Sequence, residues 1–362
     1  MKINKLLLPV LILACSITPA VQCQTLAVAP PGDVLRVGHL GRETGDLERI
    51  IHFYHDLLGL GLRGERNAPR PFWSSPGLID FANTPKYAEF RAVIMPIPGT
   101  SASSDAGNGM TIEAIEFRNM ERHQYVQNVS DIGGSHLVLI LRDLDKTLAL
   151  LKAEGVPIIT TGGEPVELQL WSPHRERAII VRDPDGYPVE LNEPLPRTAT
   201  TDDSNILGAG IAVTVKDLDT TLHLYKDLVN PEWNIVANAD FTKNEGLNKL
   251  WNTPGAEYRE GGFMIPGSPV ALRFFQFRNI EQKMIKPILQ DIGVAHVLFM
   301  AKDLDVIMPR IRAAGLHVLA TSGEPVFIAP RVRAVFVPDP NHFFMEFMER
   351  IPDEEVRTPT GK

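Results

Sequence analysis

Apolar and polar positions alternate along this chain in a pattern that recurs several times. From Val34 an apolar run typical of a strand leads into a segment with helical spacing. The apolar positions on one face of that helix are Leu47, Ile50, Ile51, Tyr54, Leu57 and Leu58. Asp46 is placed to open the helix and Gly59 to end it. Strands are then predicted around Leu78–Phe81, Glu89–Met95 and Met110–Phe117.

A second copy of this pattern occupies residues 133–193. His136 lies on its first predicted strand, and Asp143 can cap the helix that follows. An Asp-Pro-Asp-Gly turn at 183–186 leads to a last strand that carries Glu190. The copy therefore predicts the order strand, helix and then three strands.

The pattern starts again at Ile206 and at Gly293, after a break rich in Pro, Thr and Asp. Irregular segments also recur at constant spacing, which indicates duplication. Phe117-Arg118-Asn119 matches Phe277-Arg278-Asn279, and Asp131-Ile132-Gly133 matches Asp291-Ile292-Gly293. The chain is thus expected to contain four copies of one unit.

A strand–helix–three-strand unit with His on its first strand and Glu on its last resembles the vicinal oxygen chelate superfamily. That superfamily includes glyoxalases, bleomycin-resistance proteins and extradiol dioxygenases. The resemblance implies an α+β fold of four βαβββ modules paired into two glyoxalase-like domains. The expected boundaries are a first domain at 33–195, a linker at 196–204, a second domain at 205–350 and a tail at 351–362.

The resemblance also implies a metal site, with ligands from the first and last strand of each of two paired units. Carried over to this sequence, the ligands are His39, Glu113, His136 and Glu190. Two imidazoles and two carboxylates suit one divalent ion, for which Zn, Ni, Mn, Fe and Co are all acceptable. Glu116 lies on the opposite face of the strand from Glu113 and is expected to point outward or to pack on a helix.

The second half departs from this ligand pattern. Gly210 takes the place of His39 and Arg273 takes the place of Glu113, so that only His296 and Glu346 remain. Two ligands rarely hold a catalytic metal, and Arg273 adds a positive charge. We expect this half to be a degenerate copy with a structural role, with anion binding or shaping of the first cleft as alternatives.

Three functions are compatible with these residues. The first is a glyoxalase-like lyase or isomerase, which acts on a small vicinal-oxygen substrate through an enediolate, with Glu190 or Glu113 as the base. The second is an Fe(II) ring-cleaving dioxygenase of the extradiol type. The third is a non-catalytic small-molecule binding protein of the bleomycin-resistance type.

Composition narrows the range of partners. The chain has 362 residues with a net charge of −8. It lacks the clustered stripe of Lys and Arg that would indicate nucleic-acid binding. No later stretch is apolar enough to predict a membrane span. Four units on one chain can complete both clefts, so that a monomer and a homodimer both remain possible.

Residues 1–27 have the features of an export signal. Lys2 and Lys5 precede the short apolar core Leu6–Ala14. The segment predicts either an ordinary secretory peptide or, because Cys15 follows Ile-Leu-Ala, a lipoprotein signal with a lipid anchor at Cys15. Both alternatives predict an exported protein.

Overall fold

The structure is a computed structural model. It describes residues 32–101, 109–171, 174–197, 204–230, 237–264, 268–284 and 286–352. The expected signal segment with Cys15 lies outside the described residues, as do most of the expected linker and nearly all of the tail. Within the described ranges, no helix combines the length and the apolar content needed to cross a membrane.

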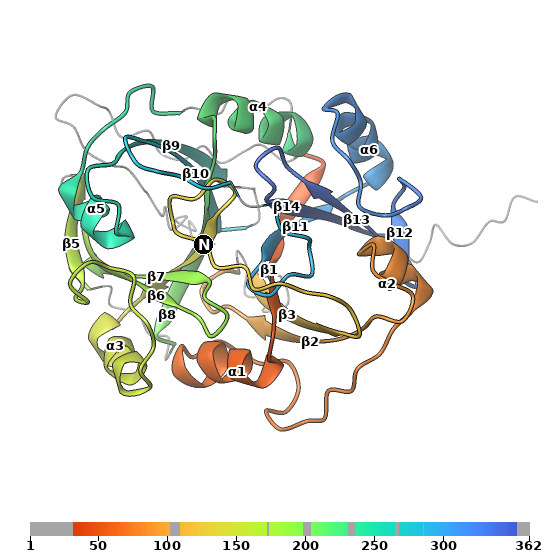
Figure 1. Cartoon of the computed structure of the whole chain (residues 1–362), viewed down its shortest axis with the longest axis horizontal. Helices are drawn as coiled ribbons and strands as arrows, with labels where there is room; N and C mark the ends of the chain where they lie inside the picture. The colour runs from red at the N-terminus through yellow and green to blue at the C-terminus, as the bar shows by residue number, and fades with distance from the viewer. Residues whose placement is uncertain are drawn as a thin grey trace, which may run out of the picture.

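Four consecutive modules make up the described chain (Figure 1). Module 1 contains β1 (Val34–Thr44), α1 (Leu47–Ile51), the π-helical η1 (His52–Leu57), α2 (Pro76–Phe81), β2 (Glu89–Pro96) and β3 (Thr111–Arg118). Module 2 contains β4 (Ser135–Leu141), α3 (Leu144–Ala153), β5 (Val166–Trp171), β6 (His174–Arg182) and β7 (Pro188–Leu195). Module 3 contains β8 (Ile206–Thr214), α4 (Leu218–Val229), α5 (Glu245–Trp251), β9 (Glu257–Met264) and β10 (Ala271–Arg278). Module 4 contains β11 (Ala295–Ala301), α6 (Leu304–Ala313), β12 (Val326–Ala329), β13 (Val332–Pro338) and β14 (Phe344–Arg350).

The strands form two curled seven-stranded sheets that lie next to each other in Figure 1. One sheet has the order β12-β13-β14-β11-β1-β3-β2 and the other has the order β5-β6-β7-β4-β8-β10-β9. Each sheet therefore joins two modules through one antiparallel central pair, β1 with β11 or β4 with β8. This arrangement confirms the predicted α+β fold of paired modules in two glyoxalase-like domains.

The order in which the modules pair differs from the expectation that neighbours in sequence share a cleft. Module 1 shares its sheet with module 4, and module 2 shares its sheet with module 3. Each sheet thus takes strands from both sides of the expected linker at 196–204. The expectation that modules 1 and 2 share one sheet is wrong, and this decides which side chains meet.

The strand predicted at Leu78–Phe81 is also wrong, because these residues belong to helix α2. The Ser75 side chain accepts a hydrogen bond from the Leu78 N–H, and Pro76 occupies the first turn, where no intrahelical donor is needed. Module 3 has a helix, α5, at the matching place. The strands predicted around Glu89–Met95 and Met110–Phe117 are confirmed as β2 and β3.

Each module fixes its first helix on its own sheet in the same way. An Asp caps every one of these helices, as predicted for Asp46 and Asp143. The first helical N–H donates to a side chain on the module's last strand. The four pairs are Leu47 with Glu116, Leu144 with Glu193, Leu218 with Gln276, and Leu304 with Glu349. Glu116 is therefore the helix-packing residue that the sequence indicated.

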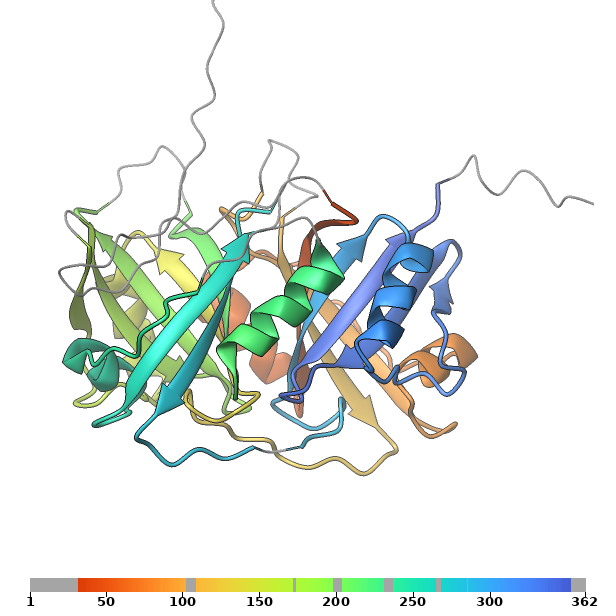
Figure 2. The same cartoon turned by 90° about the horizontal axis from the view of Figure 1, so that it is seen from above.

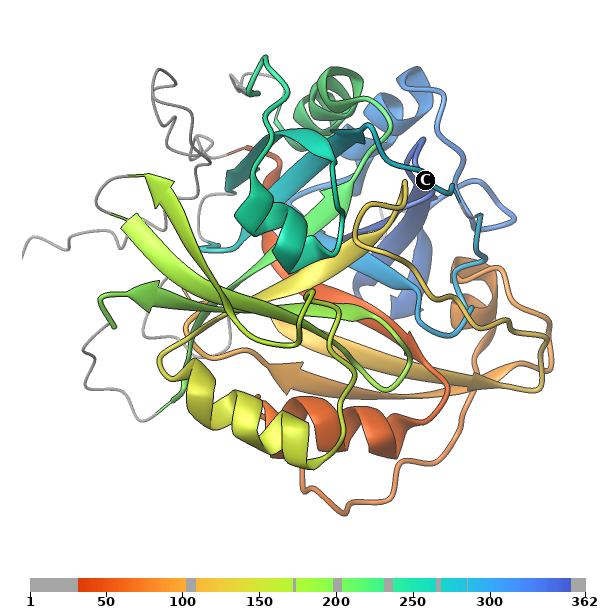
Figure 3. The same ribbon diagram turned by 60° about the vertical axis from the view of Figure 1, so that its left-hand side comes forward.

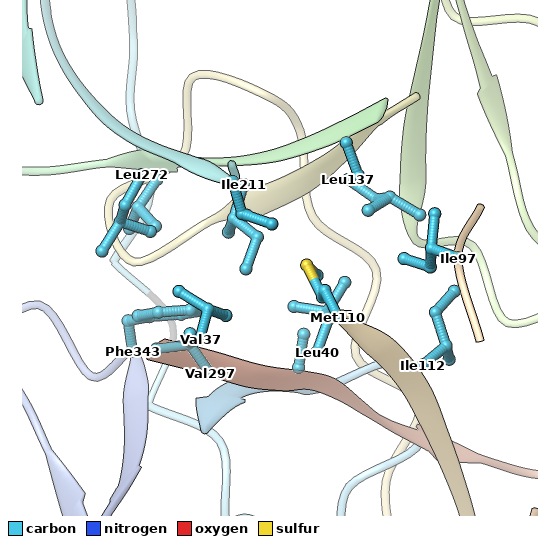
Figure 4. Packing of buried hydrophobic residues seen from close by; sticks show 14 of the residues in the cluster. Val37, Leu40, Ile97, Met110, Ile112, Leu137, Ile211, Leu272, Val297 and Phe343 are labelled. Atoms are coloured by element: carbon cyan, nitrogen blue, oxygen red, sulfur yellow. The ribbon is translucent and has the colours of Figure 1, made fainter. Parts of the chain in front are cut away.

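One apolar core lies between the two sheets and takes residues from all four modules. Figure 4 shows Leu40 of β1, Leu137 of β4, Ile211 of β8 and Val297 of β11 within it. These residues come from the two central strand pairs, so the backs of both sheets are buried against each other. The opposite, concave faces of the sheets remain available for clefts.

Helices from neighbouring modules lie side by side at the edges of the sheets. Figure 3 shows α1 with η1 beside α3, and Figure 2 shows α4 near α6. Buried ion pairing strengthens the contact between modules 1 and 2. The Arg42 guanidinium lies 2.8 Å from Asp183 Oδ2, and the Tyr54 hydroxyl donates to the same oxygen. These contacts hold the two sheets together.

Candidate metal centre

The four predicted ligands lie on different sheets. His39 is on β1 and Glu113 on β3, in the sheet of modules 1 and 4. His136 is on β4 and Glu190 on β7, in the sheet of modules 2 and 3. The structure therefore does not bring the two pairs into one site. The pair in module 1 instead shares its sheet with module 4, and the pair in module 2 shares its sheet with module 3. Modules 3 and 4 make up the half that the sequence predicted to be degenerate.

His39 meets His296 of β11 and Glu346 of β14, and all three side chains are buried. The Nε2 atoms of the two imidazoles lie 3.2 Å apart. Glu346 Oε2 lies 3.0 Å from His39 Nε2 and 3.4 Å from His296 Nε2. We call these three residues the triad. Among the described residues, the triad is the one group of this kind placed to hold a metal ion.

The triad's spacing fits a divalent ion. Two ligand atoms that each lie about 2.1 Å from one ion, at right angles, are separated by roughly 3 Å. Three such atoms cover one face of an octahedron and leave the opposite face for substrate or water. Two imidazoles and one carboxylate suit Fe, Zn, Ni, Mn or Co, so this donor set does not select one of them.

The strand register explains how the triad forms. Gly41 of β1 lies directly opposite His296 of β11. A Cβ atom on Gly41 would lie 1.8 Å from His296 Cε1, so only glycine leaves room for the imidazole. On the other side of β11, Leu298 pairs with Glu346, which places the carboxylate beside the two imidazoles.

A carboxylate contacts the second ring nitrogen of each histidine. Glu113 Oε2 lies 3.3 Å from His39 Nδ1, and Glu43 Oε1 lies 3.1 Å from His296 Nδ1. Such contacts orient a metal-binding imidazole and raise its basicity. In this arrangement Glu113 contacts the side of His39 that faces away from the triad, so its predicted role as a direct ligand stays a prediction.

Glu43 is a site residue that the sequence analysis missed. Its side chain is buried on β1, and among the described residues no group donates a hydrogen bond to its second oxygen, Oε2. The signal was present in the sequence. Glu43 follows His39 by four positions, and even spacing on a strand places both side chains on the same face.

Burial and ion pairing shift the pKa values of the triad in opposite directions. Burial alone would raise the pKa of Glu346, but hydrogen bonds from His296 and His39 lower it to about 2. Burial alone would lower the pKa of His296, but Glu346 and Glu43 raise it to about 10. Without a metal, His296 is thus a cation between two carboxylates, and a bound cation would replace its proton.

Glu113 differs from Glu346 in its electrostatic surroundings. Burial raises the pKa of Glu113, and the nearby carboxylate of Glu346 raises it further, although His39 opposes the shift. A carboxylate with a raised pKa is a stronger base than an ordinary one. Glu113 also lines the cavity described next, so that it can reach a bound molecule.

A cavity of about 120 Å³ adjoins the triad, and we call it the first cleft. Its polar end consists of Glu43, Glu113, His296 and Glu346. All its other lining residues in the described part of the chain are apolar. They are Leu78, Phe81, Ala82, Phe90, Ala92, Ile115, Phe117, Leu289, Ile328, Phe336 and Met348. The strands β2, β3, β13 and β14 supply most of the walls, and α2 covers them.

The sheet of modules 2 and 3 contains the corresponding second cleft, around His136 and Glu190. His136 Nε2 lies 3.4 Å from Glu190 Oε2, and the Trp251 indole N–H donates to the same oxygen at 3.1 Å. The Asn192 amide donates to Glu190 Oε1. Although burial opposes the charge on Glu190, His136 and Trp251 lower the pKa of this carboxyl. Hydrogen-bond donors therefore surround Glu190, and the described residues supply no third metal ligand beside it.

Arg273 supplies the positive charge of the second cleft. Its guanidinium pairs with Glu260, and Glu190 and Glu176 lie near enough to help raise its pKa against the effect of burial. Burial, together with the charge of Glu190, raises the pKa of Glu176 to about 8. The arrangement agrees with the expectation that Arg273 brings a positive charge to the degenerate site.

Larger side chains occupy the second cleft where the first is open. The shared Asn-Thr-Pro and Ala-Glu-aromatic-Arg segments align Ala82 with Trp251 and Ala92 with Glu260. The strand pairs confirm the second match, because Ala92 lies opposite Ile115 and Glu260 lies opposite Phe275. Trp251 packs against Phe275 and Phe277 in a buried aromatic cluster. The two clefts have therefore diverged in both charge and volume.

Comparison with known proteins agrees with this fold. Residues 36–191 match the family model of the Glyoxalase/Bleomycin resistance protein/Dioxygenase superfamily. The matched residues cover modules 1 and 2 and carry a domain of that superfamily, and the two sheets of paired modules agree with this match. None of the curated proteins compared with the chain matches it.

Glyoxalase I from Zea mays is similar to this chain over nearly its whole length. Its crystal structure has 14% sequence identity and a TM-score of 0.52, and the match covers 87% of this chain and 92% of that chain. The crystal structure of a mutant of the same enzyme has 14% identity and a TM-score of 0.53, with 87% and 93% covered. At this identity the likeness concerns the fold.

Proposed function

We propose that this protein is a divalent-metal-dependent enzyme that isomerises or cleaves a small substrate with two adjacent oxygens. The observation that carries the proposal is the triangle of His39 Nε2, His296 Nε2 and Glu346 Oε2, whose sides are 3.0 to 3.4 Å long. When bound there, a divalent ion would polarise a substrate carbonyl and make its α-proton easier to remove.

The residues around the triad have separate roles in this proposal. His39, His296 and Glu346 hold the ion, while Glu43 orients His296 through Nδ1. Glu113 accepts the α-proton from one substrate carbon and returns it to the neighbouring carbon. The hydroxyl proton moves from one of the two adjacent oxygens to the other, so every proton and electron pair stays within the substrate and Glu113, and the isomerisation needs no oxidant. Glu190, the other base expected from the sequence, lies in the second cleft and has no part in this reaction.

Exchange of the α-proton with solvent tests the proposal directly. We expect the metal-loaded protein to exchange the α-protons of neutral α-hydroxy ketones in D2O, as followed by NMR. Glu113→Gln should retain the metal and lose exchange by about a hundredfold or more. Glu121→Gln, on an exposed loop, serves as the matched control. Metal-loaded protein that exchanges no faster than buffer with the same ion would refute the isomerase proposal.

The same triad also supports a second candidate, an Fe(II) ring-cleaving dioxygenase. Two histidines and one carboxylate with open positions are the donor set that such enzymes use, and here Glu113 lies outside that set. Oxygen uptake distinguishes the two candidates. Protein loaded anaerobically with Fe(II) and then given catechol and O2 would consume oxygen only if the second candidate is correct.

We also propose, from the segment at 1–27, that the protein acts after export. The segment has a basic start and a short apolar core, which favour export. Fractionation of cells that express the full chain tests this proposal. Metabolic labelling with a fatty acid, compared between the natural chain and Cys15→Ala, tests the lipid anchor. Retention of the uncleaved chain in the cytoplasm would refute the proposal.

A further inference from the structure

The first cleft has an uneven distribution of polar and apolar surface. Its polar end at Glu43, Glu113, His296 and Glu346 occupies one side, and the remaining lining is aliphatic or aromatic. Phe81 and Phe336 stack with their ring centroids 4.4 Å apart and form part of that apolar wall. A molecule with its oxygens at the triad must therefore place the rest of its body against apolar side chains.

The size of the cleft matches a body of about one ring. The cavity measures about 120 Å³. A protein cavity of about 150 Å³ with apolar walls is known to bind benzene. The first cleft thus suits a single six-membered ring or a short branched chain, and it is small for an extended peptide conjugate.

The charges at the cleft disfavour anionic substrates. Among its described lining residues there is no Lys and no Arg. Glu43, Glu113 and Glu346 all reach it, and a divalent ion brings two positive charges against these three carboxylates. An additional carboxylate or phosphate on the substrate would enter an apolar wall without a partner, which is costly. The cleft therefore favours an uncharged molecule.

The duplicated chain indicates which residues keep the cleft open. Where the first cleft has Ala82 and Ala92, the second has Trp251 and Glu260. Trp251 fills its cleft and donates its indole N–H to Glu190. A large side chain at either alanine would occupy the space next to the triad without replacing any of its residues.

We propose that the first cleft binds an uncharged molecule with an apolar body of about one ring and two adjacent oxygens at one end, and that Ala82 and Ala92 determine this selectivity. The proposal rests on the proposed function, because the triad is taken to bind the two oxygens. It adds the substrate's size and charge, and it names two residues that admit the substrate without touching the metal.

Calorimetric titration of three probes tests the selectivity on the metal-loaded full chain. The probes are 2-hydroxyacetophenone, which is neutral with a ring, its 4-carboxy derivative, which is anionic, and hydroxyacetone, which lacks the ring. We expect the neutral ring compound to bind at least tenfold more tightly than either of the others. Equal or tighter binding of the carboxylate would overturn the proposal.

Three variants test the role of the alanines. Ala82→Trp and Ala92→Phe should each weaken binding of 2-hydroxyacetophenone at least tenfold, while metal content stays unchanged. Retained metal also shows that the cleft has folded. Ala153→Trp, at an exposed position of α3, is the matched control and should bind as the natural chain does. Undiminished probe binding in both cleft variants would refute the role of Ala82 and Ala92.

The metal-free chain separates this inference from the proposed function. Toluene has no oxygens and can bind only through the apolar body of the cleft. If the natural chain takes up no metal, the proposed function fails. Toluene binding that is lost in Ala92→Phe would still support the size and polarity of the cleft, whereas no toluene binding to the natural chain would refute them.

Discussion

The imidazoles of His39 and His296 lie with their Nε2 atoms 3.2 Å apart, although 257 positions separate them in the chain. His39 belongs to the first module and His296 to the last. The antiparallel pairing of β1 with β11 brings them together. The metal centre therefore depends on both ends of the folded chain, and neither half contains its full donor set.

The first prediction compares a histidine from each cleft. His296→Ala should abolish stoichiometric metal binding, because it removes one corner of the triad. His136→Ala should leave the metal content near that of the natural chain, because His136 lies in the other sheet. Plasma mass spectrometry on the purified proteins measures both. Loss of metal from the His136→Ala variant alone would contradict the assignment of the triad.

The second prediction concerns the carboxylate behind His296. Glu43→Gln keeps the size of the side chain but removes the charge that Glu43 places 3.1 Å from His296 Nδ1. Loss of such an orienting carboxylate typically weakens metal binding by about 10- to 100-fold. Competition with a chelator measures the affinity, with Glu121→Gln as the control.

A spectroscopic measurement shows whether Glu43 orients His296 or only affects folding in general. The visible spectrum of the Co(II)-loaded protein depends on how the ligands are arranged. We expect Glu43→Gln to change this spectrum, whereas the Glu121→Gln control should leave it unchanged. An unchanged spectrum together with unchanged affinity would show that Glu43 does not orient His296.

The third prediction concerns the close approach of β1 to His296. Gly41→Ala would place a Cβ atom 1.8 Å from His296 Cε1, so the imidazole must leave its position. Overpacking of this kind costs about 1–3 kcal/mol of stability, and here metal binding should be lost as well. Gly45→Ala is the matched control, since its nearest contact is the end of the Ile292 side chain at 3.3 Å. Thermal unfolding and metal content report the two effects, and intact metal binding in Gly41→Ala would contradict this prediction.

The fourth prediction concerns the stability of the second cleft as pH changes. Burial and Glu190 raise the pKa of Glu176 to about 8 from its ordinary value of 4.5. The folded protein then holds a proton on Glu176 that the unfolded chain releases, between pH 4.5 and about 8. This contribution to stability is present below pH 4.5 and is lost as the pH rises through about 8.

Glu176→Gln tests this dependence, because an amide cannot titrate. Relative to the natural chain, the variant should gain stability between about pH 6 and pH 9 in urea unfolding experiments. The charged and polar groups that face Glu176 are Glu190, Arg273, Glu260 and Asn192, and none of them changes in the variant. A difference in stability that is constant across this pH range would contradict the raised pKa.

The sequence predicted the local structure of the modules well. Helix caps such as Asp46 and Asp143 and the strands around His136 and Glu190 depend on neighbouring residues, and the structure confirms them. The strand predicted at Leu78–Phe81 failed because its apolar residues are too few to show a period. The N-cap at Ser75, followed by Pro76 in the first turn, favours a helix instead.

The sequence by itself determined that four equivalent modules exist and that His39, His136 and His296 occupy equivalent strand positions. It could not determine which modules pair, because the first strands of all four modules are largely apolar and buried, so that the local pattern does not single out a partner for any of them. Only the tertiary structure decided that β1 joins β11 and that β4 joins β8. The physical reason lies in contacts between residues far apart in the chain. Gly41 leaves the space that the His296 imidazole fills, and such a fit exists only after the two strands have met.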